Sequence, residues 1–325
     1  MSTRPIALVI GATGSIGGAV AAALLAEGWH VRGLNRSPNR PDRPDLRGVE
    51  WITGDAMNPG DILAAAQGAK VIFQGANPPG YANWARFQPG MMESCIAAAK
   101  ASGARIVLPG NVYNYGPDAW PLVSETSPQN PRTRKGAIRV TLEKRLADAS
   151  SEGVRSLVVR AGDFFGPASG SSWLTEGWVA KGKPLKAITV PGPLDVAHTW
   201  AYLPDFARSI VGLIAMEAAL PSAAVFNHGG HQVTGLELAE ALDRVAGRKL
   251  ARRNLPWFAF SLAAPFVEMV REMLEMRYLW EKEVRLDNSK LVGTLGSEPH
   301  TPLDVALKAT LIGQGCLGTE APMAA

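Results

Sequence analysis

The stretch Gly11-Ala12-Thr13-Gly14-Ser15-Ile16-Gly17-Gly18 decides how this chain folds. It follows a short apolar run, Ile6 to Ile10, and opens an alanine-rich segment, which predicts a strand, a tight glycine turn and a helix. Gly11 would let the chain reverse, Gly14 would let the backbone approach a pyrophosphate, and Gly17 would let the helix lie near the strand. The phosphates would then sit at a helix N-terminus, where free N–H groups and the helix dipole favour negative charge.

The spacing of this turn is G-x-x-G-x-x-G. One alternative is a glycine turn that precedes a helix and binds nothing. The position directly after a buried strand near the N-terminus favours a dinucleotide site instead. We therefore predict that Thr13, Ser15 and Ile16 contact the cofactor together with the three glycines.

Length and composition are those of a globular α/β protein. The chain has 325 residues, 46% of them hydrophobic, which is enough for one large domain with a smaller lobe. The formal net charge of +4 is too small to indicate nucleic-acid binding. Cys95 and Cys316 have neither metal-ligand spacing nor the pattern of a disulfide framework, so we expect no metal site and a reducing compartment.

The N-terminal residues do not indicate export, and the later apolar stretch does not indicate membrane insertion. Met1 to Pro5 leads directly into the first predicted strand and leaves no room for a signal peptide. The most apolar later stretch, Leu255 to Val267, is too short to span a bilayer and contains two prolines. We expect a cytoplasmic protein.

Apolar runs and helical patterns alternate after the glycine turn. The predicted strands cover residues 30–34, 49–53, 70–74, 105–108 and 156–160, and the predicted helices cover 61–67, 90–102 and 134–150. This alternation predicts an α/β fold with a doubly wound parallel sheet. Ligands bind such sheets beyond the carboxyl ends of the strands.

The alternation breaks down after Gly162, where the sequence becomes rich in glycine and proline. We predict a nucleotide-binding domain over residues 1–162. Residues 163–312 would form mostly a smaller C-terminal substrate lobe, with some segments that return to the first domain. Helical patterns there cover 204–216, 235–246 and 258–280, and residues 313–325 would be a tail.

The end of the second predicted strand indicates which dinucleotide binds. An NAD site usually places Asp or Glu there, about 20 residues after the first glycine, to bind the ribose hydroxyls. Here Leu34-Asn35-Arg36 holds that place, and Arg40 follows in the next loop. The planar cation of Arg36 suits a 2′-phosphate, so we predict NADP(H), with NAD as the alternative cofactor and a solvated Arg36 as the alternative role.

Two further turns would pass beside the cofactor. Asp55, with Ala56 next to it, could accept a hydrogen bond from the adenine amino group. Gly75-Ala76-Asn77 leaves room for the backbone to pass beside the ribose and pyrophosphate.

With these motifs in place, the sequence resembles the extended or atypical short-chain dehydrogenase/reductase superfamily, in particular its NAD(P)-dependent epimerase/dehydratase group. The matching runs keep the expected order over most of the chain: Thr13–Gly17, Gly54–Asp55, Leu108–Gly116, Arg160 with Phe165–Pro167, and Tyr202–Asp205. The resemblance implies a Rossmann fold and an NAD(P)-dependent enzyme, either an oxidoreductase or an epimerase.

The resemblance also implies a catalytic Tyr-x-x-x-Lys pair on the long helix and a Ser or Thr after the fifth strand. This chain departs at all three places. Lys135 stands at the tyrosine position, Arg139 at the lysine position and Asn111 at the hydroxyl position. The resulting K-G-x-x-R form is similar to that of an epimerase-like subgroup.

Some chemistry could survive these departures. Lys135 could donate a proton if burial and Arg139 lower its pKa, and Arg139 could hold ribose hydroxyls or phosphates. Alternatively, both cations are solvated on one helix face. Asn111 could orient a carbonyl, and Tyr113 could replace the missing tyrosine unless it is a packing residue.

Later polar and aromatic side chains are candidates for the substrate pocket. Asp163 could act as a base or bind a cation, although a turn role is the alternative. For His198 the alternative is a plain hydrogen-bonded histidine. The predicted substrate residues are Tyr115, Asp163, Phe164, Trp173, His198 and Trp200.

We therefore predict an NADP(H)-dependent oxidoreductase of the short-chain type. It would act on a small, partly apolar carbonyl or alcohol with non-standard acid and base residues. The alternatives are a nucleotide-sugar epimerase or dehydratase, and a catalytically silent NADP-binding sensor. The expected partner is a small-molecule substrate rather than nucleic acid or a membrane, and a homodimer is left open.

Overall fold

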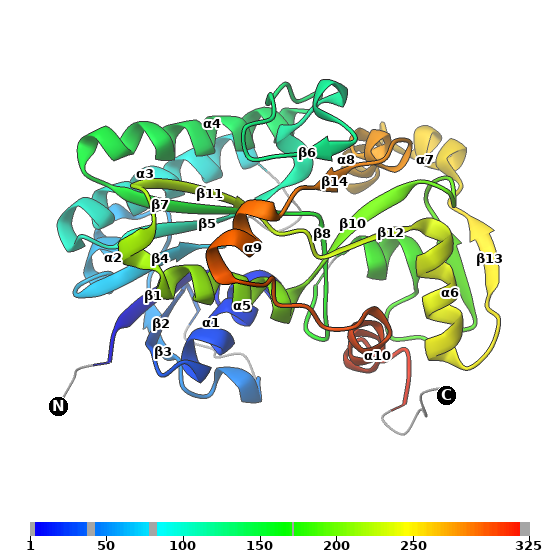
Figure 1. Cartoon of the computed structure of the whole chain (residues 1–325), viewed down its shortest axis with the longest axis horizontal. Coiled ribbons are helices and arrows are strands. Elements are labelled where there is room, and N and C mark those ends of the chain that lie inside the picture. The colour runs from blue at the N-terminus through cyan, green and yellow to red at the C-terminus, as the bar shows by residue number, and fades with distance from the viewer. Residues whose placement is uncertain (1–3, 38–42, 78–82, 171, 319–325) are drawn as a thin grey trace.

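A computed structural model describes residues 4–37, 43–77, 83–170 and 172–318 of the chain. Its centre is a seven-stranded parallel sheet with the order β11-β7-β5-β4-β1-β2-β3 (Figure 1). The strands are β1 (Ile6–Ile10), β2 (His30–Asn35), β3 (Glu50–Thr53), β4 (Ala69–Gln74), β5 (Arg105–Asn111), β7 (Arg155–Ala161) and β11 (Ala223–Asn227). The prediction of a doubly wound parallel sheet is confirmed.

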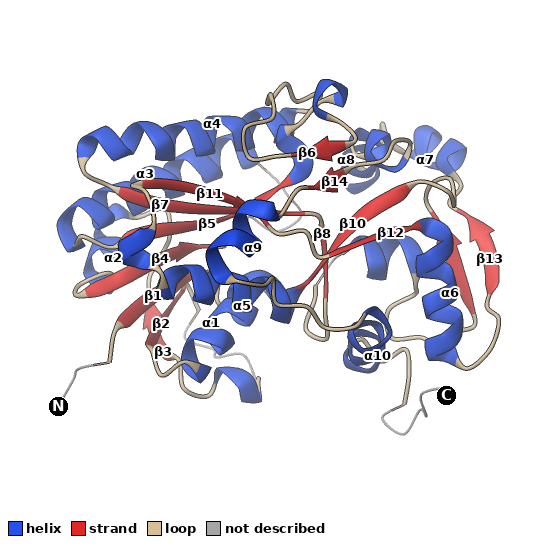
Figure 2. Cartoon of the chain, viewed as in Figure 1, coloured by secondary structure: helices blue, strands red, loops and turns tan. Residues whose placement is uncertain are grey.

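Successive side chains of a strand point to opposite faces, so each central strand supplies two cores. In β1, Ala7 and Val9 pack on one face, and Leu8 and Ile10 pack on the other. Helices cover both faces (Figure 2). The first face carries α1 (Ser15–Ala26) and α5 (Leu203–Ala215), and the second carries α2 (Pro59–Ala65), α3 (Trp84–Ser102) and α4 (Arg134–Ala149).

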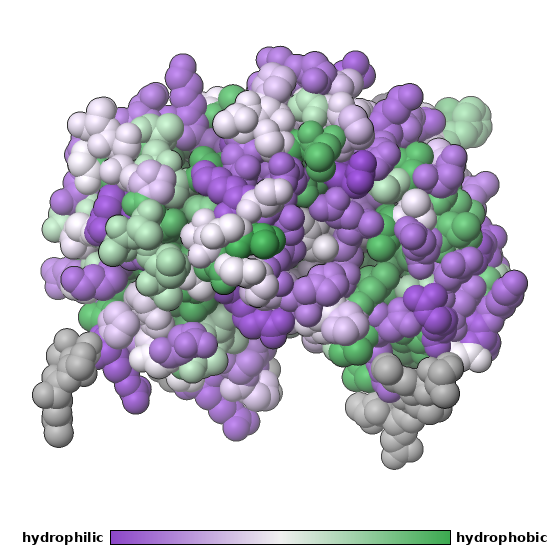
Figure 3. All heavy atoms as spheres, viewed as in Figure 1, coloured by the Kyte–Doolittle hydropathy of each residue, from purple (hydrophilic) through white to green (hydrophobic). Residues whose placement is uncertain are grey.

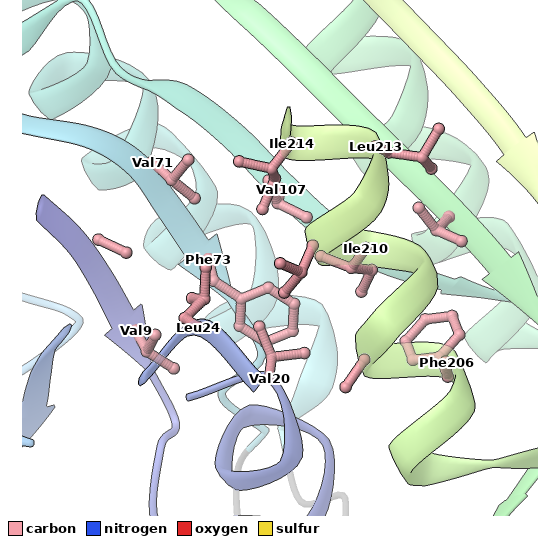
Figure 4. Close-up of a cluster of buried hydrophobic side chains, with 14 of the residues drawn as sticks. Val9, Val20, Leu24, Val71, Phe73, Val107, Phe206, Ile210, Leu213 and Ile214 are labelled. Atoms are coloured by element: carbon pink, nitrogen blue, oxygen red, sulfur yellow. The ribbon is translucent and has the colours of Figure 1, made fainter. Parts of the chain in front are cut away.

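The core between the sheet and the α1–α5 pair is wholly apolar at its centre. Val20 and Leu24 of α1 meet Phe206 and Ile210 of α5 above Phe73 of β4 (Figure 4). All five side chains are fully buried. This packing holds the start of α1 at the carboxyl edge of the sheet.

Two predicted helices had the wrong length: one was too short and the other too long. α3 begins at Trp84, before Pro89, although the prediction began at residue 90. Buried Gln88 secures this first part, because its side-chain amide donates to Ala76 O at 3.0 Å and to Asn77 Oδ1 at 2.6 Å.

The single helix predicted over 258–280 was wrong. The structure has α7 (Trp257–Ala263), α8 (Glu268–Glu275) and a short 3-10 helix, Arg277–Trp280. Pro265 stands between α7 and α8, and proline lacks the N–H that a continuous helix needs.

Beyond the large sheet, the chain forms three small sheets with the orders β12-β10-β8, β13-β9 and β14-β6. Their strands are β6 (Leu122–Val123), β8 (Asp163–Phe165), β9 (Ala187–Val190), β10 (Ala197–Tyr202), β12 (His231–Thr234), β13 (Ala251–Asn254) and β14 (Arg285–Leu286). The remaining helices are α6 (Gly235–Ala246), α9 (Ser289–Leu295) and α10 (Leu303–Gly313). The predicted division near residue 162 stays a prediction.

The cysteines and the helix lengths bear on two expectations from the sequence. Cys95 and Cys316 are both free and buried. Within the described ranges, no helix combines the length and the apolar composition needed to cross a bilayer.

A buried ion pair joins α4 to β7. Arg160 of β7, only 2% exposed, places Nη2 at 2.6 Å from Glu143 Oε2 and donates from Nη1 to Tyr115 Oη at 2.5 Å. Asn114 donates to the same carboxylate at 2.9 Å. The network fixes the loop after β5, which also carries Tyr113.

We expect Glu143→Ala to lower the free energy of unfolding by about 3–5 kcal/mol, because it leaves the Arg160 guanidinium buried without its counter-charge. Glu93→Ala is the matched control, since Glu93 pairs with Arg145 but has a side chain 55% exposed. The control should cost less than about 1 kcal/mol. Urea unfolding of both variants tests this, and equal losses would contradict it.

Candidate active site

A cavity of about 630 Å³ opens at the carboxyl ends of β1, β2 and β4. This volume is typical of a cofactor or substrate site. One half is lined by the glycine turn and the strand ends: Gly11, Thr13, Gly14, Ser15, Ile16, Leu34, Asn35, Arg36, Gly54, Asp55, Ala56, Gly75, Ala76 and Asn77. The other half includes Tyr113, Lys135, Asp163, Phe164 and Trp173.

Two of the glycines make the turn fit between neighbouring backbones. Gly11 has a φ of +86°, and a Cβ there would lie 2.7 Å from Ala76 N. A Cβ on Gly17 would lie 2.3 Å from Gly11 O, so α1 can approach β1 only without a side chain. Gly17 does not line the cavity, because it faces this backbone contact. The structure therefore gives Gly17 a packing position, and its predicted contact with the cofactor stays a prediction.

Gly14 differs, since it faces the cavity. Its backbone has a φ of −84°, which any residue adopts, and the nearest atom to an added Cβ is Gly11 O at 3.2 Å. Gly14 is the N-cap of α1, and neither a capping side chain nor an acidic residue occupies the first turn of that helix. These features fit an anionic pyrophosphate, which would meet the first N–H groups of α1.

One end of the cavity, where adenosine is predicted to bind, is bounded by Arg36 and Asp55. Asp55 is oriented by its surroundings: its N–H donates to Asp61 Oδ2 at 2.7 Å, and its Oδ1 accepts from Met57 N at 2.9 Å. Arg40 lies outside the described residues. The predicted contacts of Arg36 and Asp55 with the cofactor stay predictions.

Lys135 reaches the cavity from the first turn of α4. Thr133 caps this helix by accepting from Gly136 N at 3.0 Å, and Lys135 is 7% exposed. Tyr113 lines the same region from the short 3-10 helix Val112–Asn114. Asn111 does not line the cavity, because its Oδ1 caps this 3-10 helix by accepting from Tyr113 N at 3.0 Å.

Arg139 takes a different course from Lys135. Its Nη1 donates to Pro109 O at 3.2 Å, and its guanidinium lies 4.9 Å from the Trp84 ring centroid. One helical turn beyond Lys135, the side chain packs against α3 and β5 and does not line the cavity. The predicted contact of Arg139 with ribose or phosphate stays a prediction.

Asp163 and His198 form a close pair at the other end of the cavity, where the substrate is predicted to bind. His198 Nε2 lies 2.6 Å from Asp163 Oδ2, and the imidazole stacks on Trp280 with a centroid distance of 4.1 Å. Asp163 lines the cavity, whereas His198 stands behind it. The pair can hold the carboxylate in a fixed orientation toward a ligand.

Two predicted substrate residues lie inside the protein instead. Tyr115 is fully buried and bonded to Arg160, and burial raises the pKa of its phenol although Arg160 opposes the shift. Trp200 is 1% exposed and packs edge-on against Phe165. Neither reaches the cavity, because both side chains point into neighbouring cores.

The sequence analysis missed part of the wall: Met57, Phe87, Met91, Ser169, Ser172, Glu176, Met273 and Met276. Gly170 N donates to Ser15 Oγ at 2.6 Å, which brings Gly170 onto the glycine turn. The spacing of Met273 and Met276 was the one available signal, since apolar residues three apart share a helix face.

Comparison with known proteins gives a matching family model and several curated relatives. A model of the NAD dependent epimerase/dehydratase family matches residues 7–229. A 3-diazoavenalumate denitrifying reductase from a Streptomyces species is 28% identical over 179 residues, which cover 50% of this chain and 57% of that protein. The chain spans about half the length of the curated relatives it matches.

Solved structures share the fold over nearly the whole chain. A protein from Burkholderia cenocepacia J2315, described as a candidate epimerase, has a TM-score of 0.76 at 20% identity, covering 97% of this chain and 99% of that one. The UDP-glucose 4-epimerase from Bifidobacterium longum, solved with NAD+ and UDP, has a TM-score of 0.71 at 16% identity, covering 96% and 100%. At identities this low, the likeness shows a shared fold and nothing more.

We expect Gly14→Val to abolish binding of a dinucleotide while the protein still folds. The backbone at Gly14 tolerates a side chain, but the added atoms would occupy the space that a pyrophosphate needs. Gly293→Ala is the control, because a Cβ there meets no atom within 4 Å. Quenching of tryptophan fluorescence by added cofactor measures affinity. Normal affinity in folded Gly14→Val would show that the turn is structural only.

Proposed function

The chain belongs to the NAD dependent epimerase/dehydratase family. We propose that it is an oxidoreductase of the short-chain dehydrogenase/reductase type that reduces a small, partly apolar carbonyl compound with NADPH. The observation that carries the proposal is the character of the cavity wall. Cationic and acidic side chains are distributed unevenly along this wall. One end suits the adenosine part of the cofactor, and the opposite end suits the substrate.

The adenosine end supports NADP(H). Asn35 ends β2 and Arg36 follows it, so an amide and a cation occupy the place where a carboxylate would repel a 2′-phosphate. An arginine fork can bind a phosphate through two parallel hydrogen bonds.

The opposite end supports a small substrate over a nucleotide sugar. The charged side chains lining the described cavity are Arg36, Asp55, Lys135, Asp163 and Glu176. The diphosphate of a nucleotide sugar would have to be neutralised at the end that offers one cation, Lys135, and two carboxylates. The neighbouring wall of Phe164, Trp173 and Met276 suits an apolar group instead.

Lys135 would supply the proton in this reaction. When bound, NADPH would supply the hydride that the carbonyl carbon of the substrate needs. The oxygen then takes a proton from the Lys135 ammonium, leaving an alcohol and a neutral amine that solvent reprotonates. Asp163, held by His198, would orient a polar group of the substrate, and Phe164 and Trp173 would exclude water.

A turnover screen distinguishes this proposal from its rivals. We expect a set of apolar aldehydes and ketones to include a substrate that consumes NADPH stoichiometrically. Interconversion of UDP-sugars with tightly retained NAD would support an epimerase. Cofactor binding without turnover of any compound would support a sensor, and either outcome overturns the reductase.

Arg36→Ala should remove a preference of the wild type for NADP(H) over NAD(H). Loss of a charge-assisted contact with the 2′-phosphate should cost about 1.5–3 kcal/mol, or roughly 10- to 150-fold in affinity. Arg47→Ala is the control, because Arg47 is exposed and does not line the cavity. Calorimetric titration with both cofactors measures this, and equal wild-type affinities for the two would sink the idea.

Lys135→Met should lower kcat by about 10²- to 10⁴-fold, or about 3–5 kcal/mol, because the alkoxide loses its proton donor. NADPH affinity should change little. Lys144→Met makes the same replacement at an exposed position of α4 and should leave kcat unchanged. If Lys135→Met keeps wild-type turnover, Lys135 is not the acid, and Tyr113 becomes the next residue to replace.

A further inference from the structure

Asp163 is a carboxylate that lines the cavity but lies mostly inside the protein. Hydrophilic residues cover much of the molecular face in Figure 3, and a carboxylate on such a surface is hydrated by solvent. The Asp163 side chain, in contrast, is only 12% exposed. Its negative charge must therefore be balanced by the protein or by a ligand.

The strand pairing brings one partner to this carboxylate. Asp163 begins β8 and lies opposite Trp200 of β10, and His198 stands two residues before Trp200 on the same face of that strand. His198 Nε2 lies 2.6 Å from Asp163 Oδ2. Among the described residues, His198 is the one side chain bonded to this carboxylate, so the other oxygen can accept from a ligand.

The surroundings of His198 indicate that its ring does not balance the charge. Its Nδ1 is buried and has no hydrogen-bond partner among the described residues. The ring stacks on Trp280 at 4.1 Å and meets Trp200 edge-on at 5.3 Å. An imidazolium would leave a charged N–H unpaired among these rings, whereas the neutral ring leaves only a lone pair unfilled. The neutral tautomer that donates from Nε2 therefore fits, and Asp163 keeps its charge.

The described part of the chain offers no other cation for Asp163. Neither a lysine nor an arginine of these residues forms an ion pair with the carboxylate, and Glu176 adds a second negative charge to the cavity wall. The same residues contain no cluster of three His, Cys, Asp or Glu side chains that could hold a metal ion. An organic cation is the ligand that this carboxylate suits.

Aromatic rings beside the pair favour the same kind of ligand. Trp280 stacks on His198 and also packs against Trp173, with a centroid distance of 5.1 Å. Trp173 of the cavity wall and the Asp163–His198 pair thus belong to one packed cluster. Ammonium groups are attracted both to carboxylates and to the faces of tryptophan rings.

We propose that Asp163 binds a protonated amine of the substrate. The inference rests on the proposed function and narrows it, because the carbonyl compound is then an amino ketone or amino aldehyde. Its ammonium group lies at Asp163 and its carbonyl group at Lys135, and the hydrocarbon part lies against Phe164 and Trp173. His198 is a positioning residue that holds the carboxylate.

Calorimetric titration with three probes of similar size tests this without any turnover. The probes are 2-phenylethylammonium, 2-phenylethanol and 3-phenylpropanoate, each titrated into the full chain with and without NADP+. The wild type should bind the ammonium probe about tenfold or more tightly than the alcohol, because a charge-assisted hydrogen bond replaces a neutral one. The carboxylate probe should bind most weakly, since it meets a like charge.

Three substitutions show which carboxylate is responsible. Asp163→Asn should bring the affinities for the ammonium and the alcohol to within about threefold of each other. Asp195→Asn is the matched control, because Asp195 is exposed and does not line the cavity, and it should keep the wild-type preference. Glu176→Gln should also keep it, since Glu176 is exposed and solvent screens its charge. Unchanged thermal unfolding shows that the variants remain folded.

Three results would overturn the inference. One is a wild type that binds the ammonium probe no more tightly than the alcohol, or not at all. Another is a preference that Glu176→Gln removes and Asp163→Asn keeps. The third is an Asp163→Asn variant that binds the ammonium probe normally but loses affinity for NADP+ relative to NADPH, which would assign the carboxylate to the oxidised nicotinamide ring.

The same titrations separate this inference from the proposed reaction. If the ammonium preference holds and no carbonyl compound consumes NADPH, the reductase is wrong and the cation site stands. If neutral ketones are reduced and the wild type shows no ammonium preference, the reductase stands and the cation site is wrong.

Discussion

The structure depends on the contact between two glycine backbones at the start of α1. A side chain on Gly17 would collide with the carbonyl of Gly11, so the absence of that side chain lets α1 lie against β1. The same approach puts Gly11 against the turn after β4 and leaves Gly14 at the cavity. The loop around Gly170 then docks on Ser15, which brings the second half of the chain to the glycine turn. One steric constraint therefore sets both the helix end that faces the cavity and the place where the Gly170 loop meets the glycine turn.

The α4 helix shows how the departure from the Tyr-x-x-x-Lys pattern changes the site. Lys135 and Arg139 lie one turn apart, yet only Lys135 lines the cavity, because Arg139 turns toward Pro109 and Trp84. The cation that normally supports a tyrosine is thus used for packing in this chain. A lysine ammonium at the tyrosine position is itself a proton donor, which is why a reductase without the usual tyrosine is chemically reasonable.

Much of the fold followed from the sequence, because the strands of the main sheet and helices such as α4 and α6 carry strong local patterns. The strand ends indicated Gly14 and Arg36 as site residues, the family resemblance indicated Lys135, and all three line the cavity. Tyr115 could not be placed, since its direction depends on Arg160, a partner 45 residues away. The cavity wall from α8 could not be placed either, because the spacing of Met273 and Met276 does not say what their side chains pack against. The functional roles of the lining residues remain predictions.

The most direct test of the account is a crystal structure of the protein with NADP+. We expect the pyrophosphate over Gly14 at the N-terminus of α1, the 2′-phosphate within hydrogen-bond distance of Arg36, and the nicotinamide facing Lys135 between Tyr113 and Asp163. A cofactor bound with its 2′-phosphate away from Arg36, or with its nicotinamide remote from Lys135, would contradict it.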